Sequence, residues 1–244
     1  MSQPADAHAV EQNLGRITQA HDRLMTTAAA LTDEQARAPS LLPGWTRGHV
    51  ITHIARNADS LGNLLIWAQT GVQTPQYANW DERNAQIEAG AERGAAELAE
   101  DLSGSAQAFL AQAGELGADA WRAEVQGLRG PAHPAWFTLH RRLTEVEIHH
   151  VDLDLGYGPP DWPDWFVTDM LYQVTGGIAD DADAPPVTVT DASSGRQYLL
   201  RRDARSDREI TGTGAELLAW LLGRSAGQGL VADPDGPLPA VPPF

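Results

Sequence analysis

Residues 44–58 read GWTRGHVITHIARNA. Thr46 is a favoured N-cap residue, so this stretch predicts a helix that runs from Arg47 to about Gln69. His49 and His53 are four residues apart and therefore lie on one face of that helix. This face is the first candidate for a functional site.

Residues 145–153 read EVEIHHVDL and belong to a second strongly patterned helix, predicted from Ala135 to about Asp154. Glu145 and His149 are four residues apart, which places their Cβ atoms about 6 Å from each other. A carboxylate oxygen and an imidazole nitrogen at that spacing can reach one metal ion. The same pair could form a surface hydrogen bond or ion pair, so the spacing leaves both interpretations open.

A bundle that presents Glu-x-x-x-His from one helix and a histidine from another can form a three-ligand metal site. Two histidines and one glutamate with an open fourth position are typical of catalytic zinc. Fe(II) uses the same ligand types, so the pattern indicates a divalent metal without fixing the element. The alternative for the histidines of residues 44–58 is a core-edge position, with their ring nitrogens bonded to backbone carbonyls.

The remainder of residues 1–155 also has a helical pattern. Apolar residues recur at steps of three and four from Val10 to Leu31, which predicts a long first helix. An Ala- and Glu-rich stretch covers about Asp81 to Leu116, with an interruption expected at residues 102–104. Four long helices with short breaks predict an antiparallel bundle.

Residues 156–163 read GYGPPDWP, a composition that predicts a linker. Residues 164–244 show a mixed pattern and form a second expected domain. The elements expected there are a helix from Trp165 to Ile178, a β-hairpin of residues 187–190 and 197–200, a strand at 208–211, a helix from Gly214 to Arg224 and an irregular tail from Asp233. The predicted fold class is therefore α+β, with a helical bundle followed by a smaller α+β domain.

Composition excludes several kinds of protein. The chain has 33 acidic and 17 basic residues, a net charge of −16, so we expect no nucleic acid or membrane partner. It contains no Cys and no Lys, which excludes disulfides, thiolate ligands, a cysteine nucleophile and a Schiff-base lysine. We find no signal-peptide pattern and no run of about 18 apolar residues, and therefore expect a cytoplasmic protein.

Residues 44–58 resemble the second-helix motif of the mycothiol-dependent maleylpyruvate isomerase family, in the DinB-like metal-binding superfamily. Residues 145–153 resemble that family's second metal motif. Residues 74–77, with Arg83 and Asn84, resemble the segment that follows its second helix. The resemblance implies a DinB-like four-helix bundle followed by a sterol-carrier-like α+β domain.

The resemblance also implies a set of site residues. His53, Glu145 and His149 match the metal ligands, whereas His49 matches a position that does not bind metal. Arg224, which follows Gly223, matches an arginine that reaches the active site and is the expected catalytic residue.

Two further residues are candidates for binding the substrate or the thiol. Arg83 is suited to a carboxylate, and its alternative is a solvent-exposed helix position. Asn57, one turn after His53, could hydrogen-bond substrate or thiol, or could instead contribute to helix packing.

Three residues of the second metal motif have open roles. Glu147 and His150 depart from the family's pattern at non-ligand positions, which bears on the substrate. Asp152, one turn past His149, could hydrogen-bond a ligand from behind or lie at the surface.

The activity that the resemblance implies is a cis–trans isomerisation of maleylpyruvate to fumarylpyruvate, in gentisate-type degradation of aromatic compounds. A metal-bound thiolate would add to the substrate, the C=C bond would rotate, and the thiolate would leave. Because the chain has no Cys, the thiol must be mycothiol or another low-molecular-weight thiol. A divalent metal, with zinc as the first choice, and a small dianionic substrate are therefore expected.

Two other functions fit the same residues. A mycothiol S-transferase would use the same metal and thiol but release the adduct, and a non-enzymatic protein would bind a small molecule in the C-terminal domain. We expect a monomer or a weak homo-oligomer in each case.

Overall fold

The computed structural model describes residues 7–242. The chain divides into two compact units, one ending at Gly156 and the other beginning at Tyr157. No helix within residues 7–242 is both long enough and apolar enough to cross a membrane.

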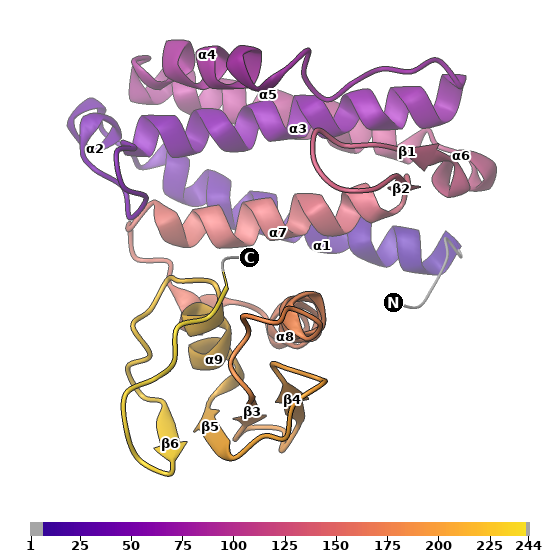
Figure 1. Cartoon of the computed structure of the whole chain (residues 1–244). Coiled ribbons are helices and arrows are strands. Elements are labelled where there is room, and N and C mark those ends of the chain that lie inside the picture. The colour runs from indigo at the N-terminus through magenta and orange to yellow at the C-terminus, as the bar shows by residue number, and fades with distance from the viewer. Residues whose placement is uncertain (1–6, 243–244) are drawn as a thin grey trace. The chain divides into compact units, whose positions relative to one another are not determined.

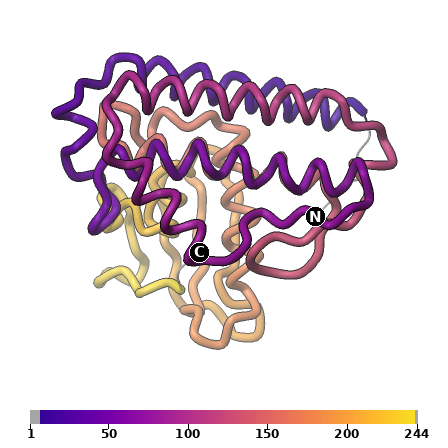
Figure 2. The backbone as a smooth tube through the Cα atoms, turned by 90° about the horizontal axis from the view of Figure 1, so that it is seen from above, coloured from indigo at the N-terminus to yellow at the C-terminus, as the bar shows by residue number. Residues whose placement is uncertain are grey.

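Four long helices form the first unit: α1 (Ala7–Ala29), α3 (Arg47–Thr70), α5 (Ala95–Gly114) and α7 (Phe137–Asp152). Each packs against two others, since α3 contacts α5 and α7, and α1 also contacts α5 and α7 (Figure 1). Figure 2 shows α3 running alongside α5 over much of its length. The unit is the four-helix bundle that the sequence predicts, with the DinB-like fold.

The bundle forms because each helix buries an apolar stripe against its neighbours. The core includes Ile17, Leu24, Ile54, Leu61, Leu65, Leu98, Phe109, Leu139 and Val146. Thr46 starts α3 as predicted, because its side chain accepts a hydrogen bond from the backbone N–H of His49. Shorter elements connect the long helices: α2 (Asp33–Arg37), α4 (Trp80–Ala91), α6 (Ala118–Arg122), and the paired strands β1 (Glu124–Val125) and β2 (His133–Pro134).

The predicted interruption at residues 102–104 is wrong. The helical stretch is broken at residues 92–94, where Gly94 is extended and Asp33 accepts a hydrogen bond from the N–H of Ala95. Helix α5 continues through 102–104 because Leu102 is buried in the core and its carbonyl accepts from the Ser105 hydroxyl. Tertiary contacts therefore outweigh the local turn propensity of Ser and Gly.

The second unit combines helices with a four-stranded sheet in the order β4-β3-β5-β6. Its elements are η1 (Pro159–Asp161), α8 (Asp164–Ile178), β3 (Val187–Asp191), β4 (Gln197–Leu199), β5 (Arg208–Gly212), α9 (Gly214–Leu221) and β6 (Val231–Asp233). Strands β3 and β4 form the predicted hairpin, and β5 lies parallel to β3.

Three expected segments of this unit differ in their bounds from the structure. Strand β6, residues 231–233, pairs antiparallel with β5 and overlaps the tail that was expected to be irregular only at Asp233. Helix α9 ends at Leu221 rather than at Arg224, because Gly223 adopts a left-handed conformation with φ of 70°. Part of the expected linker is also structured, since residues 159–161 form η1, which contacts α9.

Candidate metal centre

Three side chains from two adjacent helices converge in the bundle. His53 lies on α3, and Glu145 and His149 lie one turn apart on α7. The Nε2 atom of His53 is 3.0 Å from Oε2 of Glu145 and 3.2 Å from Nε2 of His149. The same His149 nitrogen is 3.3 Å from Oε2 of Glu145. The three atoms thus form a nearly equilateral triangle.

This triangle fits a divalent metal ion. Donors bound at about 2.0–2.1 Å in a tetrahedral site lie roughly 3.3 Å from one another. The three observed distances are close to that value. No other set of His, Cys, Asp or Glu side chains in residues 7–242 offers three donor atoms grouped in this way. Three nitrogen and oxygen donors leave the fourth position of such a site for a ligand.

Asp152 holds His149 from behind. Its Oδ2 atom is 2.7 Å from Nδ1 of His149, and its side chain is only 1% exposed. A carboxylate in this position keeps the proton on Nδ1 and turns the Nε2 lone pair towards the cluster. Of the two roles left open for Asp152, the structure shows the buried contact with His149.

The charges of the three residues are coupled. Burial alone would raise the pKa of the Glu145 carboxyl, but hydrogen bonds from His149 and His53 hold that pKa well below its usual range. Burial would lower the pKa of His149, but its bonds to Asp152 and Glu145 raise it to about 9. Burial lowers the pKa of His53, so this ring is neutral at pH 7.

Arg83 reaches the cluster from α4. Its Nη2 atom lies 3.1 Å from Nδ1 of His53. Arginine can only donate, so Nδ1 accepts this bond and the ring proton stays on Nε2, facing Glu145. The sequence predicted a substrate-binding role for Arg83, and the structure places it beside a predicted metal ligand.

Asn57 is buried behind the cluster. Its Oδ1 atom accepts a 2.9 Å hydrogen bond from Nη1 of Arg142, which also donates to the carbonyl of Ile54 at 2.7 Å. Arg142 is fully buried and donates through Nε to His21 on α1 at 3.0 Å. The observed contact of Asn57 is thus part of a buried polar network that links three helices.

Arg224 belongs to the second unit. It lies just beyond α9, where its backbone N–H donates to the carbonyl of Ala219 and its Nη1 donates to the carbonyl of Leu222, both at 2.8 Å. These bonds satisfy the C-terminal carbonyls of the helix. Its catalytic role stays a prediction.

The remaining histidines and acids of the two motifs contact other parts of the bundle. His49 completes the cap of α3, with its Nδ1 bonded to Thr46, and its Nε2 is 3.3 Å from Glu88. His150 bonds to Thr27 of α1 at 2.8 Å, and the buried carboxylate of Glu147 pairs with Arg23 of α1. Among the contacts described, none of these three side chains joins the cluster.

Sequence reasoning missed two residues beside the site. Tyr77 interacts electrostatically with two residues of the site. Burial raises the pKa of its hydroxyl, Arg83 lowers that pKa and Glu145 raises it. Gln76 is buried, and its Oε1 accepts a 2.8 Å bond from the backbone N–H of Leu128. Both belong to the stretch 74–77 that resembles the family, which was the available signal.

The chain resembles known proteins in both sequence and fold. Residues 17–154 match the family model described as the mycothiol maleylpyruvate isomerase N-terminal domain. This chain belongs to that family. A crystal structure of mycothiol-dependent maleylpyruvate isomerase superposes with a TM-score of 0.90 at 27% identity, covering 96% of this chain and 97% of the other. A histidine-to-alanine variant of that enzyme superposes with a TM-score of 0.89 over the same shares.

Comparison with curated protein sequences gave no significant match. The membership of this chain in the mycothiol maleylpyruvate isomerase family therefore rests on the family model, and the likeness to the solved structures extends over both units.

Proposed function

We propose that this chain is a metal- and thiol-dependent isomerase that converts maleylpyruvate to fumarylpyruvate. The observation that carries the proposal is the convergence of His53, Glu145 and His149, in a chain that resembles solved mycothiol-dependent maleylpyruvate isomerases over 96% of its length. The absence of cysteine supports it, because the nucleophilic sulfur must then come from a separate thiol.

His53, Glu145 and His149 would hold the metal, and we propose zinc because this donor set is typical of catalytic zinc sites. When bound, the metal and mycothiol together supply a thiolate nucleophile at neutral pH. Asp152 keeps the His149 ring in the orientation and tautomer that a metal ligand needs.

Arg83 would change partner as the site fills. A ligand bond at Nε2 of His53 requires the ring proton to move to Nδ1, which then no longer accepts a hydrogen bond from Arg83. The guanidinium is thereby released towards an anion in the site. We propose that Arg83 binds one carboxylate of the dianionic substrate, since a guanidinium matches a carboxylate at two points. Arg224 would stabilise the enolate charge that develops during the reaction.

Asn57 would support the site by orienting Arg142 behind α3, and a direct bond from Asn57 to substrate or thiol is the alternative. We further propose a cytoplasmic enzyme that acts as a monomer or weak homo-oligomer on a small molecule, without a nucleic acid partner. The net charge of −16 supports the last point.

The fate of the thiol tests the proposal against an S-transferase on the same scaffold. The zinc-loaded protein is incubated with mycothiol and an excess of maleylpyruvate, and free thiol and products are measured by chromatography. An isomerase returns all of the thiol and yields the trans isomer over many turnovers. Consumption of one thiol per substrate, with accumulation of a thioether, would identify a transferase instead.

A further inference from the structure

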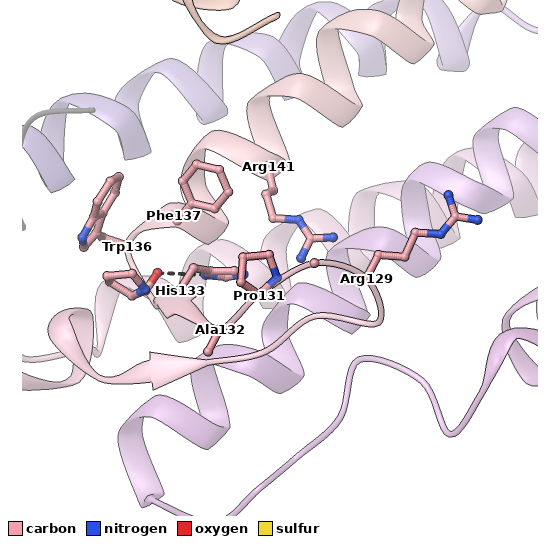
Figure 3. Close-up of a pocket in the computed structure, with 9 residues that line it drawn as sticks. Arg129, Pro131, Ala132, His133, Trp136, Phe137 and Arg141 are labelled. Atoms are coloured by element: carbon pink, nitrogen blue, oxygen red, sulfur yellow. Dashed lines mark hydrogen bonds between the residues drawn. The ribbon is translucent and has the colours of Figure 1, made fainter. Parts of the chain in front are cut away.

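A pocket of about 490 Å³ lies beside the first turns of α7. The loop of residues 129–134 forms one wall, and Trp136, Phe137 and Arg141 form the other. Figure 3 shows the Arg141 side chain extending from α7 towards Pro131 of this loop. Most of the lining is apolar, and Arg129 and Arg141 are the charged groups in it.

The pocket and the candidate metal centre share one face of α7. Phe137, Arg141, Glu145 and His149 follow one another at intervals of four residues, so they form a single row along the helix. Four residues rise by about 6 Å, which places Arg141 one turn from Glu145 and Phe137 a further turn away. A small molecule held at the metal centre can therefore extend along this row to Arg141.

Arg141 makes no ion pair within the part of the chain that the structure describes. Within residues 7–242 no carboxylate lies at ion-pair distance from it, and its one described hydrogen bond is a long one, 3.5 Å to Oε1 of Gln76. Burial lowers the pKa of the Arg141 guanidinium, while Glu145 and Tyr77 act in the opposite direction. A half-buried cation with no carboxylate at contact distance favours the binding of an anion beside it.

Other arginines of the bundle are arranged differently. Arg56 and Arg93 both pair with Asp101, at 2.6 and 2.7 Å, and Arg23 pairs with Glu147. The chain has almost twice as many acidic as basic residues, so unpaired arginines are not a result of scarce carboxylates. The missing counter-ion at Arg141 is therefore a property of this place in the fold.

Two more guanidiniums without a described carboxylate partner lie near the same row. The Cζ atom of Arg129 is 4.3 Å from the ring centroid of Trp80, and that of Arg83 is 5.7 Å from the same ring. Trp80 thus connects Arg129, in the pocket, with Arg83, at His53. Arg83, Arg129 and Arg141 together give this face of the N-terminal unit a local positive charge.

We propose that Arg141, assisted by Arg129, binds the carboxylate of a linear dicarboxylate substrate that lies farther from the metal, at the edge of the pocket nearest to Glu145. This inference rests on the proposed function and adds a substrate-binding residue to it. It also defines the ligand class: a chain with an anionic group about one helical turn from the reacting end. The carboxylate offers Arg141 the two-point contact that no protein group supplies.

Such a contact is made in the bound substrate and persists through the reaction. Its loss should therefore raise KM and leave kcat nearly unchanged. For Arg141→Met we expect KM to rise about 10- to 100-fold, the range for a lost hydrogen bond to a charged group. A role confined to the stability of the fold would not produce this split.

The test is binding of pimelate, an unreactive seven-carbon dicarboxylate, to the zinc-loaded protein without thiol, measured by calorimetry. Arg141→Met should weaken pimelate binding about 10- to 100-fold while zinc content stays unchanged. Gly127→Ala should also weaken pimelate binding. A Cβ at that position would lie 2.4 Å from Nη1 of Arg141 and displace the guanidinium. Arg122→Met is the matched control, since Arg122 is exposed and pairs with Asp119 on α6.

Wild-type affinity for pimelate in both Arg141→Met and Gly127→Ala would overturn the proposal, as would the absence of saturable binding to the wild-type protein. The two proposals fail separately. Pimelate binding that depends on Arg141, in a protein without isomerase activity, would support the dicarboxylate subsite and contradict the isomerase. Isomerase activity with an unchanged KM in Arg141→Met would support the isomerase and contradict the dicarboxylate subsite.

Discussion

The donor atoms of the candidate metal centre belong to side chains that are also held at their other end. His149 is fixed by the buried Asp152, and His53 is contacted by Arg83 and by the ring of Trp45, whose centroid is 5.5 Å from its own. Side chains held in this way lose little conformational freedom when a ligand arrives. The donor atoms are therefore held in place by the surrounding protein.

Removing one donor should release the metal while the bundle remains folded. We expect His53→Ala and His149→Ala to lose most of one bound zinc per chain, because two donors hold a divalent ion poorly. Elemental analysis after gel filtration measures the zinc, and circular dichroism checks the fold. His49→Ala is the control and should keep its zinc, since His49 caps α3. Full zinc retention in both ligand variants would refute the ligand assignment.

Asp152→Asn should weaken zinc binding about 10- to 100-fold, the usual effect of losing a carboxylate behind a metal-bound histidine. An amide can donate to Nδ1 of His149, which would favour the wrong ring tautomer. A competition titration with a chelator measures the affinity. The matched control is Asp154→Asn, two residues along, because the side chain of Asp154 is 64% exposed. Equal zinc affinities in both variants would show that Asp152 has only a structural role.

The sequence predicted the three donors but not the network behind them. Arg142 stands beside Glu145 in a row of charged residues on α7, and such rows usually face solvent. Its acceptors are His21, Ile54 and Asn57, which lie 121, 88 and 85 residues away in the chain. A local pattern cannot reveal partners on other helices, so Arg142 became visible only in the folded bundle.

At the scale of elements, α7 carries two of the three donor side chains of the candidate metal centre. One face carries the row that ends in Glu145 and His149, and Glu147 and His150 contact α1 instead. The bounds of α1, α3 and α7 followed to within a few residues from the hydrophobic period and the Thr46 cap, whereas the break at residues 92–94 and strand β6 did not. Those two features depend on Asp33 and on pairing with β5, which are contacts distant in sequence.

The contact between α1 and α7 should make the bundle sensitive to acid. Burial and the neighbouring Arg142 lower the pKa of His21 to about 2, far below the value of about 6.5 in an unfolded chain. Only the unfolded state then takes up this proton as the pH falls below about 6.5. The contribution of His21 to the free energy of unfolding is thus complete well above that pH and falls by up to about 1.4 kcal/mol per pH unit below it.

Substituting His21 isolates this contribution. His21→Gln keeps an acceptor for Arg142 but does not titrate, so it should lose about 1.6 kcal/mol less stability than the wild type between pH 6.5 and 5. Urea unfolding at both pH values measures the difference. Parallel losses in the two proteins would show that His21 is protonated in the folded state as well.

At the scale of the whole molecule, the family's fold covers both units, while the residues assigned from contacts all lie in the first. Arg224 is the residue by which the second unit would enter the reaction. If it stabilises the developing enolate, Arg224→Ala should lower kcat about 100- to 1000-fold, equivalent to about 2.7–4 kcal/mol, with zinc content and Tm nearly unchanged. Arg224→Lys should restore little, because an ammonium lacks the planar two-point contact.

Steady-state kinetics of both Arg224 variants check this expectation. The alternative is that Arg224 only satisfies the end of α9 through its bond to the Leu222 carbonyl. Its replacement would then cost about 0.3–1 kcal/mol of stability and leave turnover intact. A fall in kcat/KM of less than about fivefold would support that structural role.

The central claim is that the metal held by His53, Glu145 and His149 and an external thiol act together on a cis double bond. The most direct measurement follows the absorbance of maleylpyruvate with zinc-loaded protein, zinc-free protein and zinc-loaded His149→Ala, each with and without mycothiol. The account predicts rapid conversion to the trans isomer only where wild-type protein, zinc and mycothiol are all present. Equal conversion by the zinc-free protein, or by the zinc-loaded protein without thiol, would contradict it.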